Sequence, residues 1–416
     1  MIKRFLFIIT VLLTANAFAQ EGNTSPYSYY GIGLREFKGT VENQAMGGLN
    51  ILGDSIHTNL SNPAGYGALK LTNFALGGSR KDVNLKEDQG KGTTASTTFD
   101  YLSLSFPVSK QMGAGFGLLP YSSVDYKINN TSGGTYEQFY GRGGINRAFV
   151  TLGYEFFNSL RLGARGSYNF GNIRRESIQD DDSQQYGIQE VVRSDISGIS
   201  LDFGLQYETK IKSNLSIYSS LTYSPELKLS SENRREISSI ASVNRTTGQV
   251  TVRETNALET TKTDFNLPEE TTVGLGFGQQ NKWFAGAQYE NIQASNFRNP
   301  SFSLQDVRYD NASKYRLGGF FVPRFNSISS YWERVVYRAG VRYEETGLNI
   351  NGEGINEFGI SFGLGLPMGR AFSNANLSFE YGQRGTTNAG LIREDFFKIG
   401  LSLSLNDKWF VPFKFN

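Results

Sequence analysis

The chain contains one histidine, His57, and no cysteine. Any catalysis that pairs a histidine with a serine or an aspartate would have to use it, and Asp54 and Ser55 lie just before it. Catalytic groups must meet at a defined geometry, which neighbours in sequence do not provide by themselves. We therefore interpret His57 as a polar structural residue and expect no enzymatic activity. The absence of cysteine excludes disulfides and thiolate metal sites.

An acidic run, Asp180-Asp181-Asp182, has the side chains that bind a divalent cation through oxygen ligands. The same composition is typical of a solvated loop tip. We expect the loop tip, with no bound metal and no cofactor.

Four arginines, Arg142, Arg147, Arg161 and Arg165, recur on neighbouring predicted strands. They have the charge to attract a carboxylate head group. They also have acidic neighbours such as Glu155 to pair with, and we expect the pairing.

The N-terminus, MIKRFLFIITVLLTANAFAQ, reads as a secretory signal peptide over residues 1–19. Lys3 and Arg4 form the charged region, and Ala17-Phe18-Ala19 forms the cleavage site. Removing them leaves 39 Lys and Arg against 39 Asp and Glu. A neutral mature chain argues against nucleic-acid binding, which requires a basic excess. No later stretch approaches 18 apolar residues, so no membrane-spanning helix is predicted.

Alternation of large apolar with small or polar residues predicts membrane-spanning β-strands. In EFGISFGLGLP, Phe358, Ile360 and Phe362 share one face, and the opposite face holds glycines and a serine. A soluble sandwich also alternates. Here the polar faces mix Gly, Ser, Arg and Glu, as suits a wet lumen, so we expect an all-β transmembrane antiparallel barrel in the outer membrane.

We predict about 14 strands, an even number as a closed single-chain barrel requires. The predicted spans are 69–79, 98–108, 112–127, 135–157, 159–178, 189–208, 214–228, 267–279, 281–293, 313–323, 334–344, 354–368, 374–384 and 394–405. Short connections follow most even strands. Longer polar ones follow the odd strands, at 80–97, 179–188, 229–266 and 294–312. This asymmetry is typical of short periplasmic turns and long outer loops.

Three tryptophans, Trp283, Trp332 and Trp409, fall beside the predicted periplasmic connections or the C-terminus, where interfacial aromatics belong. The stretch 229–266 is too long for a plain loop. A turn at Thr246-Thr247-Gly248 separates two strand-like runs, which predicts an extended extracellular β-hairpin near 229–266.

Residues 20–68 precede the barrel (69–416) and are irregular and Gly-rich. Irregular backbone cannot face lipid, but it can fill a lumen where other groups satisfy it. A barrel of this size needs a plug or it leaks. We expect residues 20–68 to form an N-terminal hatch. The motif Asn62-Pro63-Ala64-Gly65 near its end could belong to the hatch or could be an ordinary turn, because Asn-Pro and Gly are routine turn formers.

Together, the stretch AMGGLNILGDSIHTNLSNPAGYGAL at 45–69 and the strand count resemble the FadL-type outer-membrane transporters of long-chain fatty acids and other hydrophobic compounds. In that family a Gly-rich hatch ends in an Asn-Pro-Ala motif before the first strand, and Asn62, Pro63 and Ala64 match it. The C-terminal ending also resembles a subgroup of the family, with Phe415 displaced from the last position. The loops show no match that identifies a ligand.

The resemblance implies passive uptake of a hydrophobic molecule or lipid, with lateral release into the bilayer through a gap caused by a distorted third strand. Here the third predicted strand contains Pro120, and a mid-strand proline cannot donate to the ladder. Pro120 marks either a lateral opening or a structural bulge. The alternative function is a non-transporting subunit of a larger outer-membrane complex for protein secretion or barrel assembly, with other outer-membrane proteins as partners.

Overall fold

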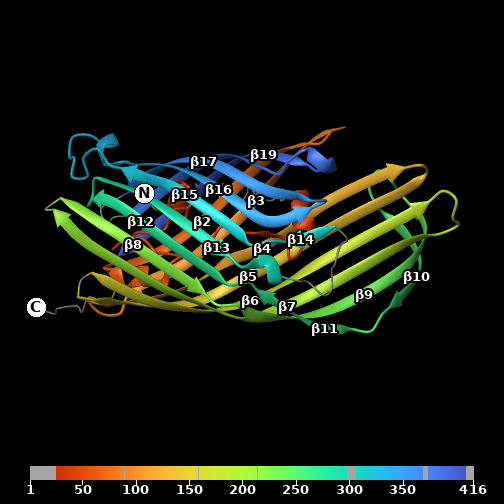
Figure 1. Ribbon diagram of the computed structural model, residues 1–416, viewed down its shortest axis with the longest axis horizontal. Helices are drawn as coiled ribbons and strands as arrows, with labels where there is room; N and C mark the ends of the chain where they lie inside the picture. The colour runs from red at the N-terminus through yellow and green to blue at the C-terminus, as the bar shows by residue number, and fades with distance from the viewer. Residues whose placement is uncertain are drawn as a thin grey trace, which may run out of the picture.

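A closed antiparallel β-barrel dominates the computed structural model, which describes residues 25–88, 90–157, 159–212, 214–297, 306–368 and 373–408 (Figure 1). The first wall strand pairs with the last from Thr72–Asp407 to Lys86–Arg393, and this pairing closes the ring. The wall has 14 strand positions, as the alternation predicted. The signal peptide, Trp409 and Phe415 lie outside the described residues.

Two wall positions are each built from two strands separated by a proline. After Pro225, β8 (Leu215–Ser224) continues into β9 (Leu227–Val243), and after Pro268, β11 (Thr261–Leu267) continues into β12 (Glu270–Gln279). The other wall strands are β2 (Thr72–Lys86), β3 (Lys91–Pro107), β4 (Met112–Ser132), β5 (Thr135–Phe156), β6 (Leu160–Asp181), β7 (Gly187–Lys212), β13 (Trp283–Ile292), β15 (Ala312–Phe321), β16 (Val336–Ile350), β17 (Glu353–Met368), β18 (Ser373–Arg384) and β19 (Arg393–Asp407). The connections contain η3 (Ala294–Asn296), β14 (Val307–Tyr309), η4 (Trp332–Arg334) and η5 (Asn388–Gly390).

Large apolar side chains face outward and small or polar side chains face the lumen. Phe362 is 58% exposed and Leu401 is 45% exposed, whereas Ser361 and Ser402 are both 2% exposed. Successive side chains of a strand point to opposite faces, so strict alternation produces one lipid-compatible face and one polar face. Among the described residues, no helix is long and apolar enough to cross a membrane.

The two ends of the barrel differ. Short turns join strands at 108–111, 157–159 and 280–282, and we call this the short-turn end. At the opposite, long-loop end, the predicted loops are shorter than expected: β2 and β3 leave only 87–90 of the predicted loop 80–97 between them, and β6 and β7 leave 182–186 of the predicted loop 179–188. Those predictions were wrong because both faces of these segments are polar, so alternation ends while backbone pairing continues.

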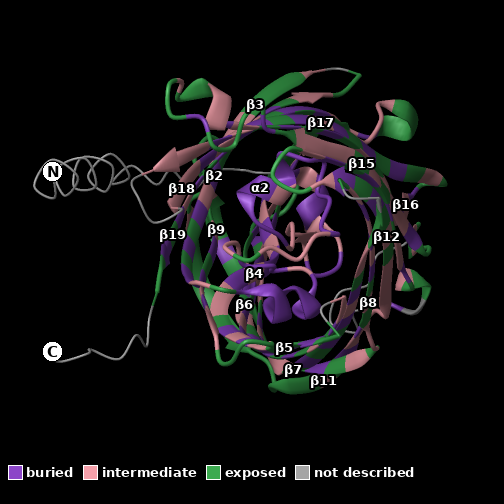
Figure 2. Ribbon diagram, turned by 90° about the vertical axis from the view of Figure 1, so that its left-hand side faces the viewer, coloured by how far each residue is buried: buried purple, intermediate pink, exposed green. Residues whose placement is uncertain are grey.

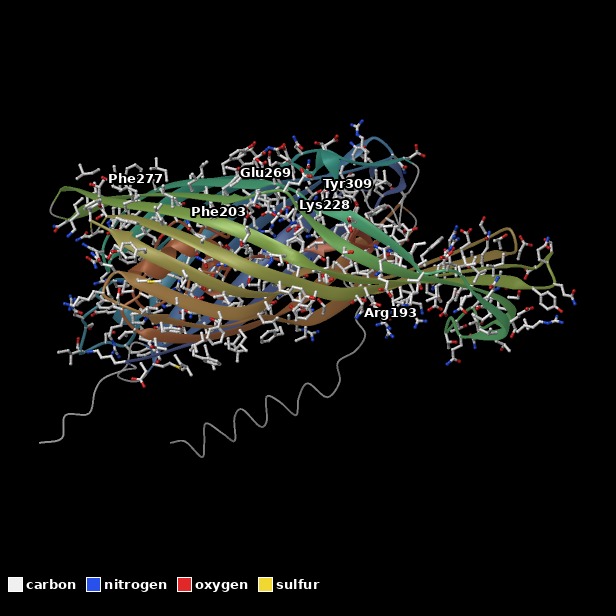
Figure 3. The ribbon with its side chains drawn as sticks, turned by 90° about the horizontal axis from the view of Figure 1, so that it is seen from below. Arg193, Phe203, Lys228, Glu269, Phe277 and Tyr309 are labelled. Atoms are coloured by element: carbon white, nitrogen blue, oxygen red, sulfur yellow. The ribbon has the colours of Figure 1, made fainter. Side chains whose placement is uncertain are left out.

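A narrow extension projects from the long-loop end, beyond a neck at Arg193 (Figure 3). It contains the tips of β5, β6 and β7 with β9 and β10 (Val250–Ala257); β7 pairs there with β9 instead of β8. The predicted turn lies between β9 and β10, and Gly248 has a φ of +78° within it. The predicted hairpin at 229–266 is therefore two different parts, since β11 belongs to the wall and only β9–β10 projects.

The acidic run folds against this hairpin. The Arg245 guanidinium donates to the carboxylates of Asp180 (3.1 Å) and Asp182 (2.6 Å), and Asp181 accepts hydrogen bonds from Ser183 and Thr135. The run therefore anchors the turn at 244–249 and is not simply a solvated tip.

Residues 25–71, which we call the N-terminal segment, lie inside the ring of strands (Figure 2). The segment contains η1 (Pro26–Tyr29), β1 (Leu34–Arg35), α2 (Val41–Gln44) and η2 (Pro63–Ala68). It begins near Glu394 in the long-loop half and reaches the short-turn end, where it leads into β2 at Thr72.

Candidate functional site

The Asn62-Pro63-Ala64-Gly65 motif begins η2. Asn62 is extended, and its side-chain oxygen accepts a hydrogen bond from the Ala64 amide at 3.0 Å. Proline suits the first position of a helix because that amide needs no partner. The Asn62 side-chain amide also donates to the carbonyl of Leu205 in the wall at 3.2 Å. The motif is thus both a helix cap and a contact with the barrel.

Wall glycines make room for this turn. A Cβ added at Gly163 would collide with the backbone of Pro63 and Ala64, and one at Gly204 would collide with Asn62. The close approach of two backbones explains why β6 and β7 carry glycine on their lumen faces here.

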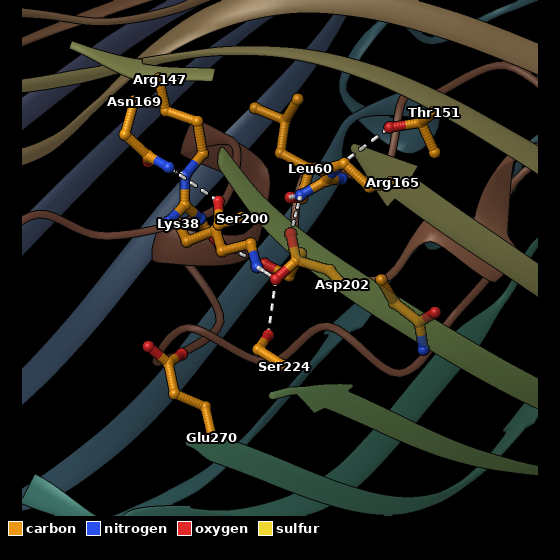
Figure 4. Close-up of polar contacts among 12 residues, drawn as sticks. Lys38, Leu60, Arg147, Thr151, Arg165, Asn169, Ser200, Asp202, Ser224 and Glu270 are labelled. Atoms are coloured by element: carbon orange, nitrogen blue, oxygen red, sulfur yellow. Dashed lines mark hydrogen bonds and ion pairs between the residues drawn. The ribbon is translucent and has the colours of Figure 1, made fainter. Parts of the chain in front are cut away.

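A buried charged cluster holds the middle of the N-terminal segment (Figure 4). Asp202 accepts hydrogen bonds from Lys38 at 2.9 Å and from Ser224 at 2.5 Å. The guanidinium of Arg165, which is fully buried, lies 3.7 Å from the same carboxylate and donates to the carbonyl of Leu60 at 2.5 Å. One wall aspartate and one wall arginine thus bind two distant parts of the segment.

Further pairs continue these contacts around the lumen. Arg35 forms an ion pair with Glu270, and Ser25 donates to Glu394. Gln44 donates to Glu380 at 3.0 Å, and Asn376 donates to Glu42 at 2.7 Å. Each of these contacts places a carboxylate opposite a hydrogen-bond donor, and the wall residues lie on β12, β18 and β19, so the segment is fixed on several sides.

The four predicted arginines have different environments. Arg161 donates to Glu155 at 2.9 Å, as expected. Arg147 donates to Asn169 at 2.9 Å and stacks on the Tyr121 ring, and Arg165 binds the N-terminal segment. Arg142 is exposed, lies opposite Asp125 and Arg174 in the sheet, and lines the cavity described below.

His57 connects the part of the segment just before η2 to the wall. Its Nδ1 lies 2.6 Å from an Asp54 carboxylate oxygen, and its Nε2 lies 3.2 Å from the side-chain amide of Asn374 on β18. Burial by itself lowers the pKa of His57, but the Asp54 carboxylate outweighs burial, so the net pKa is raised. These contacts are structural.

Pro120 lies where β4 leaves β3. The two strands pair only from Leu102–Leu118 to Pro107–Gly113, and the β4–β5 register shifts between Pro120 and Ser122. Beyond this point β1 pairs with β4, with Arg35 opposite Ser122 and Leu34 opposite Ser123. The N-terminal segment therefore takes the edge of β4 that β3 has left, and we call the interval between β3 and β4 the seam.

A cavity of about 560 Å³ lies between the N-terminal segment and the wall. Its lining reaches the seam through Thr97 and Thr98 of β3 and Ser123 and Asp125 of β4. Aromatic residues line it together with many charged ones: Arg35, Glu36, Lys81, Asp125, Arg142, Lys314, Arg316, Arg342, Glu344, Glu357, Glu380, Arg384 and Lys398. A ligand there would meet charge as well as apolar surface.

A family model described as BamG matches residues 1–416. The chain belongs to the BamG family. No curated protein sequence matches it. The resemblance to FadL-type transporters therefore holds at the level of the fold, and the family is a different one.

Solved structures with a similar fold include the Pseudomonas putida toluene transporter TodX, at 17% identity and a TM-score of 0.58, covering 90% of this chain and 99% of that one. A Pseudomonas aeruginosa FadL homologue is similar at 11% identity and a TM-score of 0.53, covering 88% of this chain and 97% of that one. At such low identities, the similarity shows only that this BamG-family chain shares the fold of those proteins.

The sequence reasoning did not identify Lys38, Asp202 or Glu270 as anchors. A usable signal was present, since Asp202 is an acid on the lumen face of a strand whose outward residues, Leu201 and Phe203, are apolar. A charge at such a position requires a partner inside the barrel.

We predict that Asp202→Asn loosens the N-terminal segment of this BamG-family protein. The change leaves Lys38 and Arg165 without their counter-charge, and breaking a buried pair costs about 3 kcal/mol or more. The urea midpoint of unfolding should fall, and protease should cut residues 25–71 sooner. Asp195→Asn, which removes surface pairs with Arg193 and Arg234, is the control and should cost less than about 1 kcal/mol. Equal effects of the two variants would contradict the anchor.

Gly163→Ala should displace the Asn62-Pro63 turn, because the added methyl group meets the backbone of η2. Overpacking of this kind costs about 1–3 kcal/mol. Gly166→Ala, on the same strand with open space around its Cβ, is the matched control and should be neutral or slightly stabilising. Thermal unfolding, followed by heat-modifiable gel migration, distinguishes the two.

Stability should also depend on pH through His57. Its pKa is raised above the usual 6.5, so protonated His57 stabilises the folded state fully below about pH 6.5, and this contribution disappears as the pH rises through the raised value. The urea midpoint should fall more between pH 6 and pH 9 in the wild type than in His57→Gln. An identical fall in both proteins would show that His57 makes no such contribution.

Proposed function

We propose that this protein is a non-transporting, FadL-like outer-membrane barrel that acts as an accessory subunit of a larger protein complex for secretion or barrel assembly. The observation that carries the proposal is the filling of the lumen: residues 25–71 are tied to the wall on several sides by partly buried ion pairs and buried hydrogen bonds. Membership of the BamG family favours outer-membrane protein partners.

We infer that the N-terminal segment is the hatch that the sequence predicts. Opening it would break the Lys38–Asp202 pair, the Arg35–Glu270 pair and the contacts of Arg165 with Leu60 together. Losing one partner of a fully buried pair typically costs about 3–5 kcal/mol, and the exposure of Lys38 and Arg35 makes the cost of breaking these two pairs smaller. A segment held by several such contacts suits a fixed structural filling better than a gate that opens with each molecule of substrate.

The polar border of the cavity supports the same choice. An uptake route for hydrocarbons would be lined mainly by apolar and aromatic side chains along its whole length. Here apolar surface makes up the larger share of the lining, but charged residues interrupt it, and Ser, Thr and Asp border the seam. The polar borders raise the cost of passing an apolar molecule through this wall.

The test is purification from native membranes in a mild detergent, with mass spectrometry of proteins and extractable lipids. We expect stoichiometric recovery with at least one other outer-membrane protein and without a bound fatty acid. Recovery of this chain alone, carrying a stoichiometric hydrophobic ligand, would reject the accessory role and support transport instead.

The second candidate function is passive uptake of fatty acids or other hydrophobic molecules with lateral release. The specific observation in its favour is the position of Pro120 at the seam, beside the cavity. Lys81 and Lys398 lie directly opposite each other and line the same cavity, which suits an anionic head group. Similarity in fold to a toluene transporter supports this candidate only by analogy.

A further inference from the structure

Strand β3 has a long unpaired edge. Among the described residues, its pairing with β4 begins only at Leu102, whereas its pairing with β2 continues to Lys91. Residues 91–101 therefore present one side of their backbone to no strand. We call this stretch the β3 free edge.

The seam opens within the apolar belt of the barrel. The last β3–β4 pair, Leu102–Leu118, lies in a row that continues through Ala148 and Tyr168 to Ile199. Tyr168 is 52% exposed and Ile199 is 65% exposed, as lipid-facing residues are. On the other side, Phe99 of the free edge is 48% exposed and shares its row with Leu401. The lower part of the free edge thus lies where water is scarce and unpaired backbone groups are costly.

The opposite border of the seam is already paired with an added strand. The short strand β1 pairs with β4 at Ser122 and Ser123, the Glu36 amide donates to the Tyr121 carbonyl at 2.9 Å, and the Ser25 amide donates to the Asp125 carbonyl at 3.3 Å. An extended segment of this chain therefore pairs with the backbone groups of β4 at one edge of the seam. No described segment does the same for the other edge.

The free edge lacks most of the features that protect strand edges. Such edges usually carry lysines, prolines or bulges. Residues 91–101, KGTTASTTFDY, contain no proline and place their lysine at the far tip, and the register shift opposite Gly77 and Gly78 affects only the base at Asp100. The threonines favour extended backbone. A row of backbone amides and carbonyls is recognised by another extended peptide.

We propose that the β3 free edge accepts an extended strand from a different outer-membrane protein, which pairs along residues 91–101 and completes the wall at the seam. This inference rests on the accessory role proposed above and assigns the contact through which it is exercised. The added strand would be recognised through its backbone amides and carbonyls. Its outward-facing side chains need to be apolar only beside Phe99, where the wall faces lipid.

The experiment places a photo-crosslinking amino acid at Thr97, which is exposed on the free edge, in the full-length protein in native membranes. Ser230 on β9 is the matched control, because it is exposed and polar but lies in a strand paired on both sides, with β7 and β11. We expect an adduct with one other outer-membrane protein at Thr97 and none at Ser230. A lysine on an edge obstructs strand addition, so Thr97→Lys should lower partner recovery by about five-fold or more, while Ser230→Lys should not. Heat-modifiable migration verifies that each variant barrel is folded.

The outcomes separate the two proposals. If partners are recovered equally with Thr97→Lys and Thr97 gives no protein adduct, the free edge is not the contact, although the accessory role stands. If the wild type yields no partner from native membranes, the accessory role fails and the inference fails with it. An adduct of two copies of this chain, or adducts with lipid alone, would also overturn the assignment to a different protein.

Discussion

A β-sheet wall in hydrocarbon has to satisfy its backbone groups by pairing within itself, because no water is available to do so. The 14-strand ring meets this requirement through continuous antiparallel pairing, from β2 around to β19. The exception among the described residues is the seam, where β4 turns away from β3 near Pro120. The path of the N-terminal segment is connected to that exception, since β1 occupies the edge of β4 that the turn exposes. One local break in the wall thus organises both the filling of the lumen and the exposed edge of β3.

The size and the alternating side chains of the ring also determine what can fill the lumen. A ring of this size encloses more volume than its own side chains fill, and the inward face is polar because alternation places large apolar residues on the lipid side. Irregular chain can occupy such a space only if its polar groups are matched. The structure matches them with buried charges, of which Asp202 and Arg165 are the clearest, since together they bind Lys38, Leu60 and Ser224. The segment also packs tightly against wall glycines such as Gly163, so shape complementarity accompanies the pairing of charges.

The family model and the structural similarity name different proteins. The two findings are compatible because they concern different parts of the molecule. The wall resembles TodX and a FadL homologue along nearly the whole chain, while the family is BamG. A barrel wall is constrained mainly by lipid and backbone pairing, so distant sequences share it. Function depends on what fills and borders the wall. In this chain those parts are a tied N-terminal segment, a charged cavity and a polar seam.

The sequence by itself determined the barrel, its number of strands, the turn in the β9–β10 hairpin and the partnership of Arg161 with Glu155. Each of these rests on a local signal: side-chain period, turn residues, or charges on adjacent strands. The tertiary structure alone decided that Lys38 meets Asp202, that His57 meets Asn374, and that β1 borders β4. These contacts join residues far apart in the chain, and they exist only after the ring closes and fixes which lumen-facing residues are opposite one another. The overshoot of β2, β3, β6 and β7 beyond their predicted ends has a related cause, because backbone pairing above the membrane leaves no hydrophobic period to read.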